Sequence, residues 1–294
     1  MNELIFSKYE IWHDESKKGG FHHGVLFVPV DMREVIIAHI KKIRQEFGYG
    51  LGEDAKYAGS LQGGKHGAYI RNILALFAHV IQKRFIKSTQ MFNRTERDKY
   101  EGKCIPFLTV SGLFNCKFGL LKSVDNFSSL TCSIYKNKVE LTCGFITKCC
   151  AHGMFGNNDP IEIVKVYLDG DEHHGGGVNP KKLFKGDFRN YCKISEDIEI
   201  DSRHLKERTD ETRIMINFID NIVGAWRSKL NKESDVSKVL LPLDEIYQRL
   251  NDGKICSNIN SRWYKSICCS ELIVEKGNIE FIDIFRDKEQ MELW

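Results

Sequence analysis

The sequence predicts an α/β fold in which a parallel or mixed sheet is flanked by helices. Short apolar runs typical of strands occur at residues 9–12, 25–30, 161–169 and 198–201. Longer segments with helical spacing of apolar residues lie between or after them, at 32–47, 65–86 and 210–230. Three of the strand-like runs lead into an aspartate, and open α/β sheets bind their ligands at strand ends. We therefore expect a functional site at one edge of the sheet.

The composition is that of a globular protein with a sizeable core. Of the 294 residues, 42% are hydrophobic and 28% charged, which is normal for a soluble domain. The 43 basic and 40 acidic side chains give a net charge of +3. This small excess neither requires nor excludes nucleic acid as a partner, because the distribution of charge matters more than its sum.

The ten cysteines do not follow a metal-binding spacing. Two adjacent pairs occur, at 149–150 and 268–269, and no Cys-x-x-Cys motif is present. The first residues lack a signal-peptide pattern, and no apolar run reaches the roughly 18–20 residues that span a bilayer. We expect a cytoplasmic protein without a membrane partner, whose cysteines are mostly buried. One hypothesis for the cysteines is that the chain is a zinc protein that uses them as ligands, which metal analysis would test.

The N-terminal segment predicts two strands joined by a glycine-bearing turn. The first strand delivers Asp14 at its end, followed by Glu15 and Ser16. Strand alternation places His13 on the opposite side of the sheet from Asp14, which suggests a structural role. The same alternation predicts that one member of the pair His22–His23 faces solvent.

The next segments predict two helices separated by an extended piece. Asp31 is expected to cap the first helix, over 32–47. Glycines at 48, 50 and 52 end it, and the extended piece 54–61 follows with a lone lysine, Lys56. The second helix, 65–86, has a wide apolar stripe and is expected to pack flat on a sheet.

Residues 83–103 combine basic and aromatic side chains. This pattern is typical of surfaces that bind a phosphate backbone, and a solvated loop with a helix end is the alternative. The nucleic-acid-binding candidates are Lys83, Arg84, Lys87, Arg94 and Arg97.

The middle of the chain contains the strongest predicted strand. Segment 112–122 is a strand or short helix, and 138–155 has the apolar spacing of a helix. The strand 161–169 ends at Asp169, a helix is expected over 180–191, and the strand 198–201 ends at Asp201. The turn after Asp169 carries further candidate ligands or general bases: Asp171, Glu172, His173 and His174.

The helix 210–230, capped by Asp210, carries Asp220 among aliphatic residues. A carboxylate in apolar surroundings is costly unless it is paired or bound to a metal. The alternative places Asp220 on an exposed polar side of the helix with Asn217 and Asn221. After this helix we expect a short helix at 243–250 and a hairpin over 273–285 that turns at 276–278.

Carboxylates that converge at one sheet edge repel one another unless a cation neutralises them. Oxygen ligands suit Mg²⁺ or Mn²⁺. Two such ions can activate a water molecule and stabilise the leaving oxygen in phosphodiester hydrolysis.

The order of these features resembles the ribonuclease-H-like proteins grouped as domain of unknown function 3800. The matching motifs are Asp14-Glu15-Ser16, Lys56 in 55–60, the strand that ends at Asp169, Asp201, and Asp220 in 219–225. The chain departs from the pattern at Phe218 and Asn221 and in the lysines 17–18. The resemblance covers about residues 9–230 and implies a ribonuclease-H-like domain over 1–235, with an insertion at about 88–135. Residues 236–294 would form a C-terminal extension packed on it.

The resemblance implies a metal-dependent nuclease that acts on DNA or RNA in defence against phage or other mobile elements. It implies Asp14, Asp169 and Asp220 as metal ligands, with Glu15 and Asp201 as further catalytic candidates and Lys56 facing the scissile phosphate. The alternative is a catalytically silent subunit on the same fold that binds nucleic acid or a partner. The C-terminal hairpin is a candidate surface for a partner protein or a second copy of the chain.

Overall fold

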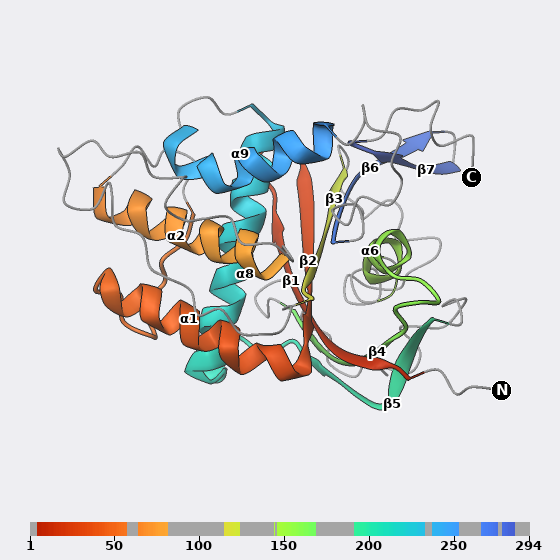
Figure 1. The fold of residues 1–294 in the computed structure, drawn as a ribbon, viewed down its shortest axis with the longest axis horizontal. Coiled ribbons are helices and arrows are strands. Elements are labelled where there is room, and N and C mark those ends of the chain that lie inside the picture. Colours follow the sequence, from red (N-terminus) through yellow and green to blue (C-terminus); the bar gives the residue numbers. More distant parts are fainter. Residues whose placement is uncertain are drawn as a thin grey trace.

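The computed structural model describes residues 5–57, 64–81, 115–123, 144, 146–168, 191–232, 237–252, 266–275 and 278–285. Its centre is a seven-stranded mixed sheet with the order β5-β4-β1-β2-β3-β6-β7. Figure 1 shows this sheet between a thick layer of helices and a smaller layer on the other face. The predicted α/β class with a mixed sheet and flanking helices is confirmed.

Strands β1, β2 and β3 form an antiparallel meander at the middle of the sheet. On the outer side of β1, β4 and β5 run parallel to it, and on the outer side of β3, β6 runs parallel to β3 and pairs with β7. The strands are β1 (Ser7–Ser16), β2 (Phe21–Pro29), β3 (Lys117–Ser123), β4 (Ile161–Tyr167), β5 (Cys192–Asp201), β6 (Ile267–Glu275) and β7 (Asn278–Asp283). The predicted C-terminal hairpin is confirmed, and it extends the central sheet.

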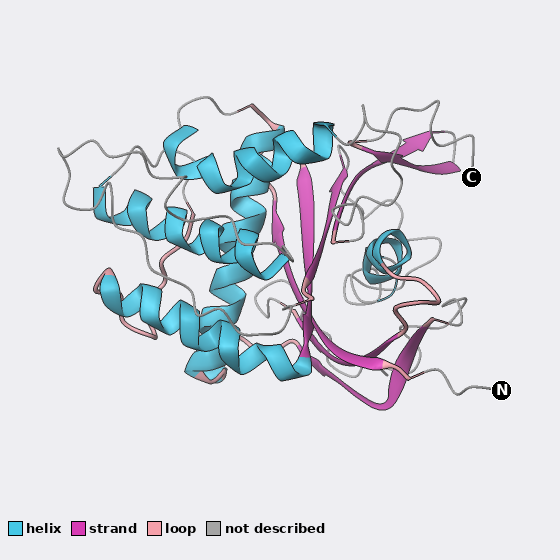
Figure 2. Cartoon of the chain, viewed as in Figure 1, coloured by secondary structure: helices cyan, strands magenta, loops and turns pink. Residues whose placement is uncertain are grey.

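Helices cover both faces of the sheet (Figures 1 and 2). In the part of the chain that the structure describes, the helices on one face are α1 (Arg33–Glu46), α2 (Gly64–Ile81), α8 (Asp210–Leu230) and α9 (Ser237–Asp252). Helix α6 (Thr147–Met154) lies on the other. Two short 3₁₀ helices, η1 (Val30–Met32) and η3 (Leu205–Glu207), precede α1 and α8. Among the described residues, no helix is both long and apolar enough to cross a bilayer.

Alternation along β1 divides its side chains between the two layers. Trp12 packs in the core under α1, α2, α8 and α9, where its ring stacks on Tyr167 of β4 at 3.7 Å between ring centroids. Ile11 belongs to the second core, formed with α6. The next residue that faces the helix layer after Trp12 is therefore Asp14.

Helix α8 approaches β2 closely beside Asp14. Gly24 pairs with Asp14 across the two strands. A Cβ atom at position 24 would lie 2.1 Å from Cγ2 of Val223, so only glycine fits there. Gly224 of α8 similarly leaves room for Tyr57, because a Cβ atom at 224 would lie 2.9 Å from the Tyr57 ring. These two glycines fix α8 against the sheet and against the chain segment that follows α1.

Three local predictions were wrong. His22 and His23 are both buried, because β2 is an inner strand that is covered on both faces. Asp31 does not cap α1, since it lies in η1 and the N-cap position of α1 is Met32. Asp210 does not cap α8, because it is the first residue inside the helix. The N-cap is Thr209, whose hydroxyl accepts a hydrogen bond from the N–H of Thr212.

Most of the predicted elements are present where the structure describes the chain. The helices predicted over 32–47, 65–86 and 210–230 correspond to α1, α2 and α8. The cysteines whose side chains are described are free and buried or half-buried, as expected: Cys116, Cys150, Cys192, Cys268 and Cys269. The basic segment 83–103, the predicted helix 180–191 up to residue 190 and the predicted turn at 276–277 lie outside the described residues.

Candidate functional site

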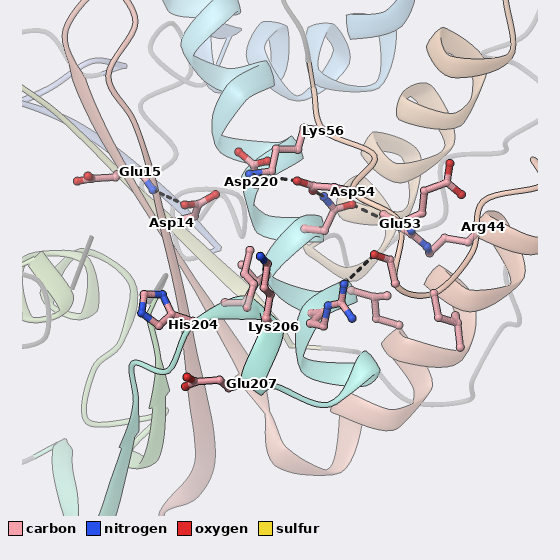
Figure 3. Close-up of a pocket in the computed structure, with 17 residues that line it drawn as sticks. Asp14, Glu15, Arg44, Glu53, Asp54, Lys56, His204, Lys206, Glu207 and Asp220 are labelled. Atoms are coloured by element: carbon pink, nitrogen blue, oxygen red, sulfur yellow. Dashed lines mark hydrogen bonds and ion pairs between the residues drawn. The ribbon is translucent and has the colours of Figure 1, made fainter. Parts of the chain in front are cut away.

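A pocket of about 760 Å³ opens where the end of β1 meets the segment after α1, η3 and the first half of α8 (Figure 3). Its lining is rich in charged side chains of both signs. The acidic residues that line it are Asp14, Glu15, Glu53, Asp54, Glu207 and Asp220. The basic residues are Arg44, Lys56, Lys206 and Arg213, with His204 beside them.

Asp14 is held at the sheet side of this pocket. Its side chain is 5% exposed and faces α8, as the alternation along β1 requires. Its Oδ1 accepts a hydrogen bond of 2.8 Å from the backbone N–H of Glu15. A hydrogen bond to the ionised carboxylate stabilises it and fixes its orientation.

Asp220 reaches the same pocket from α8. It lies one helical turn before Val223, the residue that packs against Gly24 next to Asp14. The Asp220 side chain is half-buried. The alternative of an exposed polar side with Asn217 and Asn221 is wrong, because both asparagines are buried, at 8% and 0% exposure. Asp14 and Asp220 therefore both line this pocket.

The segment 48–56 forms the outer wall of the pocket and is fastened to the helices by side chains. Arg44 of α1 is 1% exposed, and its guanidinium donates to the carbonyl oxygens of Gly50 and Glu53. Asn221 Nδ2 donates to the carbonyl oxygen of Ala55 at 3.0 Å. An irregular segment is thus held by buried donors on two helices.

Lys56 and Asp54 project from this wall into the pocket (Figure 3). Lys56 Nζ lies 3.5 Å from Asp54 Oδ2, and both side chains are about half exposed to solvent. Asp54 Oδ1 accepts a hydrogen bond of 3.1 Å from Asn217 Nδ2. The predicted site residue Lys56 therefore shares the pocket with Asp14 and Asp220.

Glu15 lies at the rim of the pocket, but its carboxylate turns to the other face of the sheet (Figure 3). There Oε2 is 3.5 Å from Nδ1 of His23, its cross-strand partner, and Oε1 is 3.2 Å from Nζ of Lys17. His13 Nε2 lies 3.2 Å from the same His23 nitrogen. The prediction that His13 and Asp14 face opposite sides of the sheet is confirmed. The Glu15 carboxylate lies on the same side as His13.

Asp201 at the end of β5 lies in a cluster of arginines and does not line the pocket. Arg203 donates to it from Nε at 3.0 Å and from Nη2 at 2.7 Å, and Arg208 Nε lies 3.8 Å from its Oδ1. Burial alone would raise the pKa of Asp201, but hydrogen bonds from Arg203 and the charges of both arginines hold the pKa below its usual value. This arrangement is that of a structural ion pair.

The remaining predicted site residues lie outside the described chain. Asp169 follows Leu168, the last described residue after β4, whose N–H donates to the carbonyl oxygen of Asp201. The ligand-rich turn at 170–177 and the basic candidates Lys83, Arg84, Lys87, Arg94 and Arg97 are also outside. Within the described residues, no group of three or more His, Cys, Asp or Glu side chains is placed to hold one ion.

Asp54, Arg44 and Asn217 line the pocket but were not among the predicted site residues. Asp54 stands two residues before Lys56, and a charged pair on one extended segment was the available signal. Nothing in the spacing of Arg44 indicates a buried donor, because it falls on the charged side of an amphipathic helix. Its role depends on the conformation of the segment 48–56.

Comparisons with protein-family models, curated proteins and solved structures give no match. The function is therefore inferred from the geometry of the pocket. Asp14 on a strand and Asp220 on a helix line this pocket together with the exposed ammonium group of Lys56.

Proposed function

We propose that the chain is a metal-dependent nuclease that hydrolyses phosphodiester bonds of DNA or RNA in the pocket between β1 and α8. One observation carries the proposal: Asp14 and Asp220, far apart in sequence, line the same open pocket, together with Lys56. The proposal also draws on the resemblance to ribonuclease-H-like proteins, with which a mixed sheet and an aspartate on the inner strand β1 agree.

The residues of the pocket fit a Mg²⁺ or Mn²⁺ ion. Mg²⁺ is usually bound through one or two carboxylates and keeps water molecules that a substrate phosphate can replace. Asp14 and Asp220 would supply those carboxylates, and the resemblance adds Asp169 as a third. When bound, the ion would polarise the phosphate and lower the pKa of a coordinated water molecule.

The chain itself would position the reacting groups. Asp14 is fixed by the N–H of Glu15, and Asp220 is fixed by a helix that the Gly24–Val223 contact locks to the sheet. Lys56 offers its ammonium group to a phosphate oxygen from the opposite wall. Lys206 on the exposed η3 helix and Arg213 of α8 add positive charge to the lining. Such preorganisation lowers the barrier because it is in place before reaction.

The test is cleavage of plasmid DNA and of labelled RNA in Mg²⁺ and in Mn²⁺ by the wild type and by Asp14→Ala, Asp169→Ala and Asp220→Asn. We expect the variants to lose at least about a hundredfold in rate, which corresponds to roughly 3 kcal/mol of transition-state stabilisation. Asp197→Asn, which changes an exposed carboxylate of β5, is the matched control and should cleave normally.

The outcomes separate the enzyme from its alternative. Loss of cleavage with retained folding and nucleic-acid binding supports the nuclease. Cleavage by none of the proteins, with nucleic acid still bound by the wild type, contradicts it and favours a subunit that only binds.

A further inference from the structure

A chain of hydrogen bonds runs from a buried arginine to the pocket lysine. Arg44 Nη1 donates to Asn217 Oδ1 at 3.3 Å, Asn217 Nδ2 donates to Asp54 Oδ1 at 3.1 Å, and Asp54 Oδ2 lies 3.5 Å from Lys56 Nζ. Figure 3 shows Arg44, Asp54 and Lys56 along the outer wall of the pocket. We call this set the Arg44–Lys56 relay.

The chemistry of the relay sets the direction of each bond. A guanidinium group has donors only, so the atom of Asn217 that faces Arg44 must be the oxygen. The amide nitrogen of Asn217 is then directed to Asp54, where it can donate only to a carboxylate oxygen. Because Arg44 is 1% exposed and Asn217 8% exposed, this orientation is fixed inside the protein before it reaches the half-exposed Asp54.

The backbone on both sides of the relay is fixed as well. Asn221 of α8 donates to the carbonyl oxygen of Ala55, and His66 Nε2 of α2 lies 3.0 Å from the carbonyl oxygen of Lys56. Tyr49 contacts the other ring nitrogen of His66 at 2.6 Å. The backbone around Lys56 is thus held by contacts from α8 and α2, and its ammonium group lies beside the Asp54 carboxylate, which Asn217 holds.

An isolated exposed ion pair would not restrict the Lys56 side chain in this way. Exposed pairs contribute little and restrict their side chains weakly, since both partners exchange contacts with water. Here the carboxylate partner of Lys56 is attached to the core through Asn217 and Arg44. The relay reduces the number of positions that the Lys56 ammonium group can take in the pocket.

We propose that Arg44, Asn217 and Asp54 are positioning residues that hold Lys56 to receive a substrate phosphate group of a nucleic acid. The proposal rests on the proposed function and goes beyond it, since it assigns a role to three residues outside the predicted site. Lys56 would touch the substrate. The other three act through it, and none of them contacts the phosphate.

The test measures affinity for a fluorescent single-stranded oligonucleotide, in buffer with Ca²⁺ in place of Mg²⁺, across about 50–200 mM salt. Lys56→Ala should bind about three- to tenfold more weakly, and its slope of log affinity against log salt should be lower by about 0.7–0.9, the contribution of one phosphate contact. Asn217→Leu removes both relay bonds without changing the net charge. It should weaken binding in the same direction, by about two- to fivefold.

Two double variants separate positioning from a merely structural role. In Lys56→Ala, adding Asn217→Leu should cause no further loss, because residues that act through one contact are not additive. Exchanging the two groups, Asn217→Asp with Asp54→Asn, keeps the net charge and reverses the second bond. It also replaces the carboxylate beside Lys56 with an amide, whose oxygen can still accept a hydrogen bond from the ammonium group. The carboxylate at 217 still accepts from Arg44, and the amide at 54 donates to it. This exchange should restore affinity to within about twofold of the wild type.

Three results would overturn the proposal while the wild type still binds and cleaves. These are wild-type affinity in Asn217→Leu, additive losses in the double variant with Lys56→Ala, or no recovery in the exchanged pair when it unfolds at the wild-type temperature. Absence of both oligonucleotide binding and cleavage in the wild type would overturn the proposed function and this inference together.

Discussion

Asp14 and Asp201 both lie at the ends of strands of one sheet, but their surroundings differ. Asp14 lies beside an open pocket and is oriented by a backbone N–H group. Asp201 is enclosed by Arg203 and Arg208, which neutralise it. An aspartate at a strand end therefore does not define a functional site. At Asp201, the counter-charge of Arg203 and Arg208 gives a structural ion pair, whereas Asp14 borders the pocket.

The largest effect is expected from a substitution that disturbs the close packing of α8 against β2 beside Asp14. Gly24→Ala would place a Cβ atom 2.1 Å from Val223 Cγ2 and push α8 away from β2. We expect a loss of about 2–3 kcal/mol in the free energy of unfolding, measured by urea denaturation, and a lower cleavage rate. Gly156→Ala is the control, because no described residue other than its chain neighbours has a heavy atom within 4 Å of the added Cβ. Equal stability of the two variants would refute the close contact.

For a substitution of Asp201, we expect a smaller loss of stability and no loss of activity. Asp201→Asn leaves Arg208, whose side chain is fully buried, without its carboxylate partner. We expect unfolding to require about 1–3 kcal/mol less, with the cleavage rate within about threefold of the wild type. Asp197→Asn on the same strand should change stability by under about 0.5 kcal/mol. A cleavage rate reduced a hundredfold by Asp201→Asn would instead return Asp201 to the catalytic group.

The smallest predicted effect is a pH dependence of the difference in unfolding free energy between the wild type and Asp201→Asn. The pKa of Asp201 is lowered in the folded protein, so the folded state binds its proton less readily than the unfolded state, where the pKa is about 3.9. The stabilisation is thus fully present above about pH 5 and is lost as pH falls through the folded pKa. Urea denaturation of the wild type and Asp201→Asn should show a constant difference at pH 5–8 that shrinks below about pH 4. A difference that grows on acidification would contradict the assignment.

Periodicity and turn residues were sufficient to predict the α/β class and many of the described helices and strands, but not the order of the strands in the sheet. The strands β1, β2, β4 and β5 and the helices α1, α2 and α8 carry their own apolar pattern. The burial of both His22 and His23 was not predictable locally, because it depends on the position of β2 inside the sheet. The same limit applies to Asp31 and Asp210, which have the chemistry of N-caps but lie beside the residues that occupy the cap position.

The site was predictable in part for the same reason. Asp14 and Asp220 stand out because each is a carboxylate beside or within an apolar run, whereas Lys56 was expected only from the resemblance. All three line one pocket. Asp54, Arg44 and Asn217 could not be identified, since their role is created by contacts between α1, α8 and an irregular segment. Long-range pairing of this kind leaves no periodic signal.

The most direct test of the central claim is calorimetric titration of Mn²⁺ into the wild type, Asp14→Asn, Asp220→Asn and Asp201→Asn. If Asp14 and Asp220 share one ion-binding pocket, each of their variants should bind Mn²⁺ at least about tenfold more weakly. Asp201→Asn should bind it like the wild type. Equal affinity in all four proteins, or a loss confined to Asp201→Asn, would contradict the account.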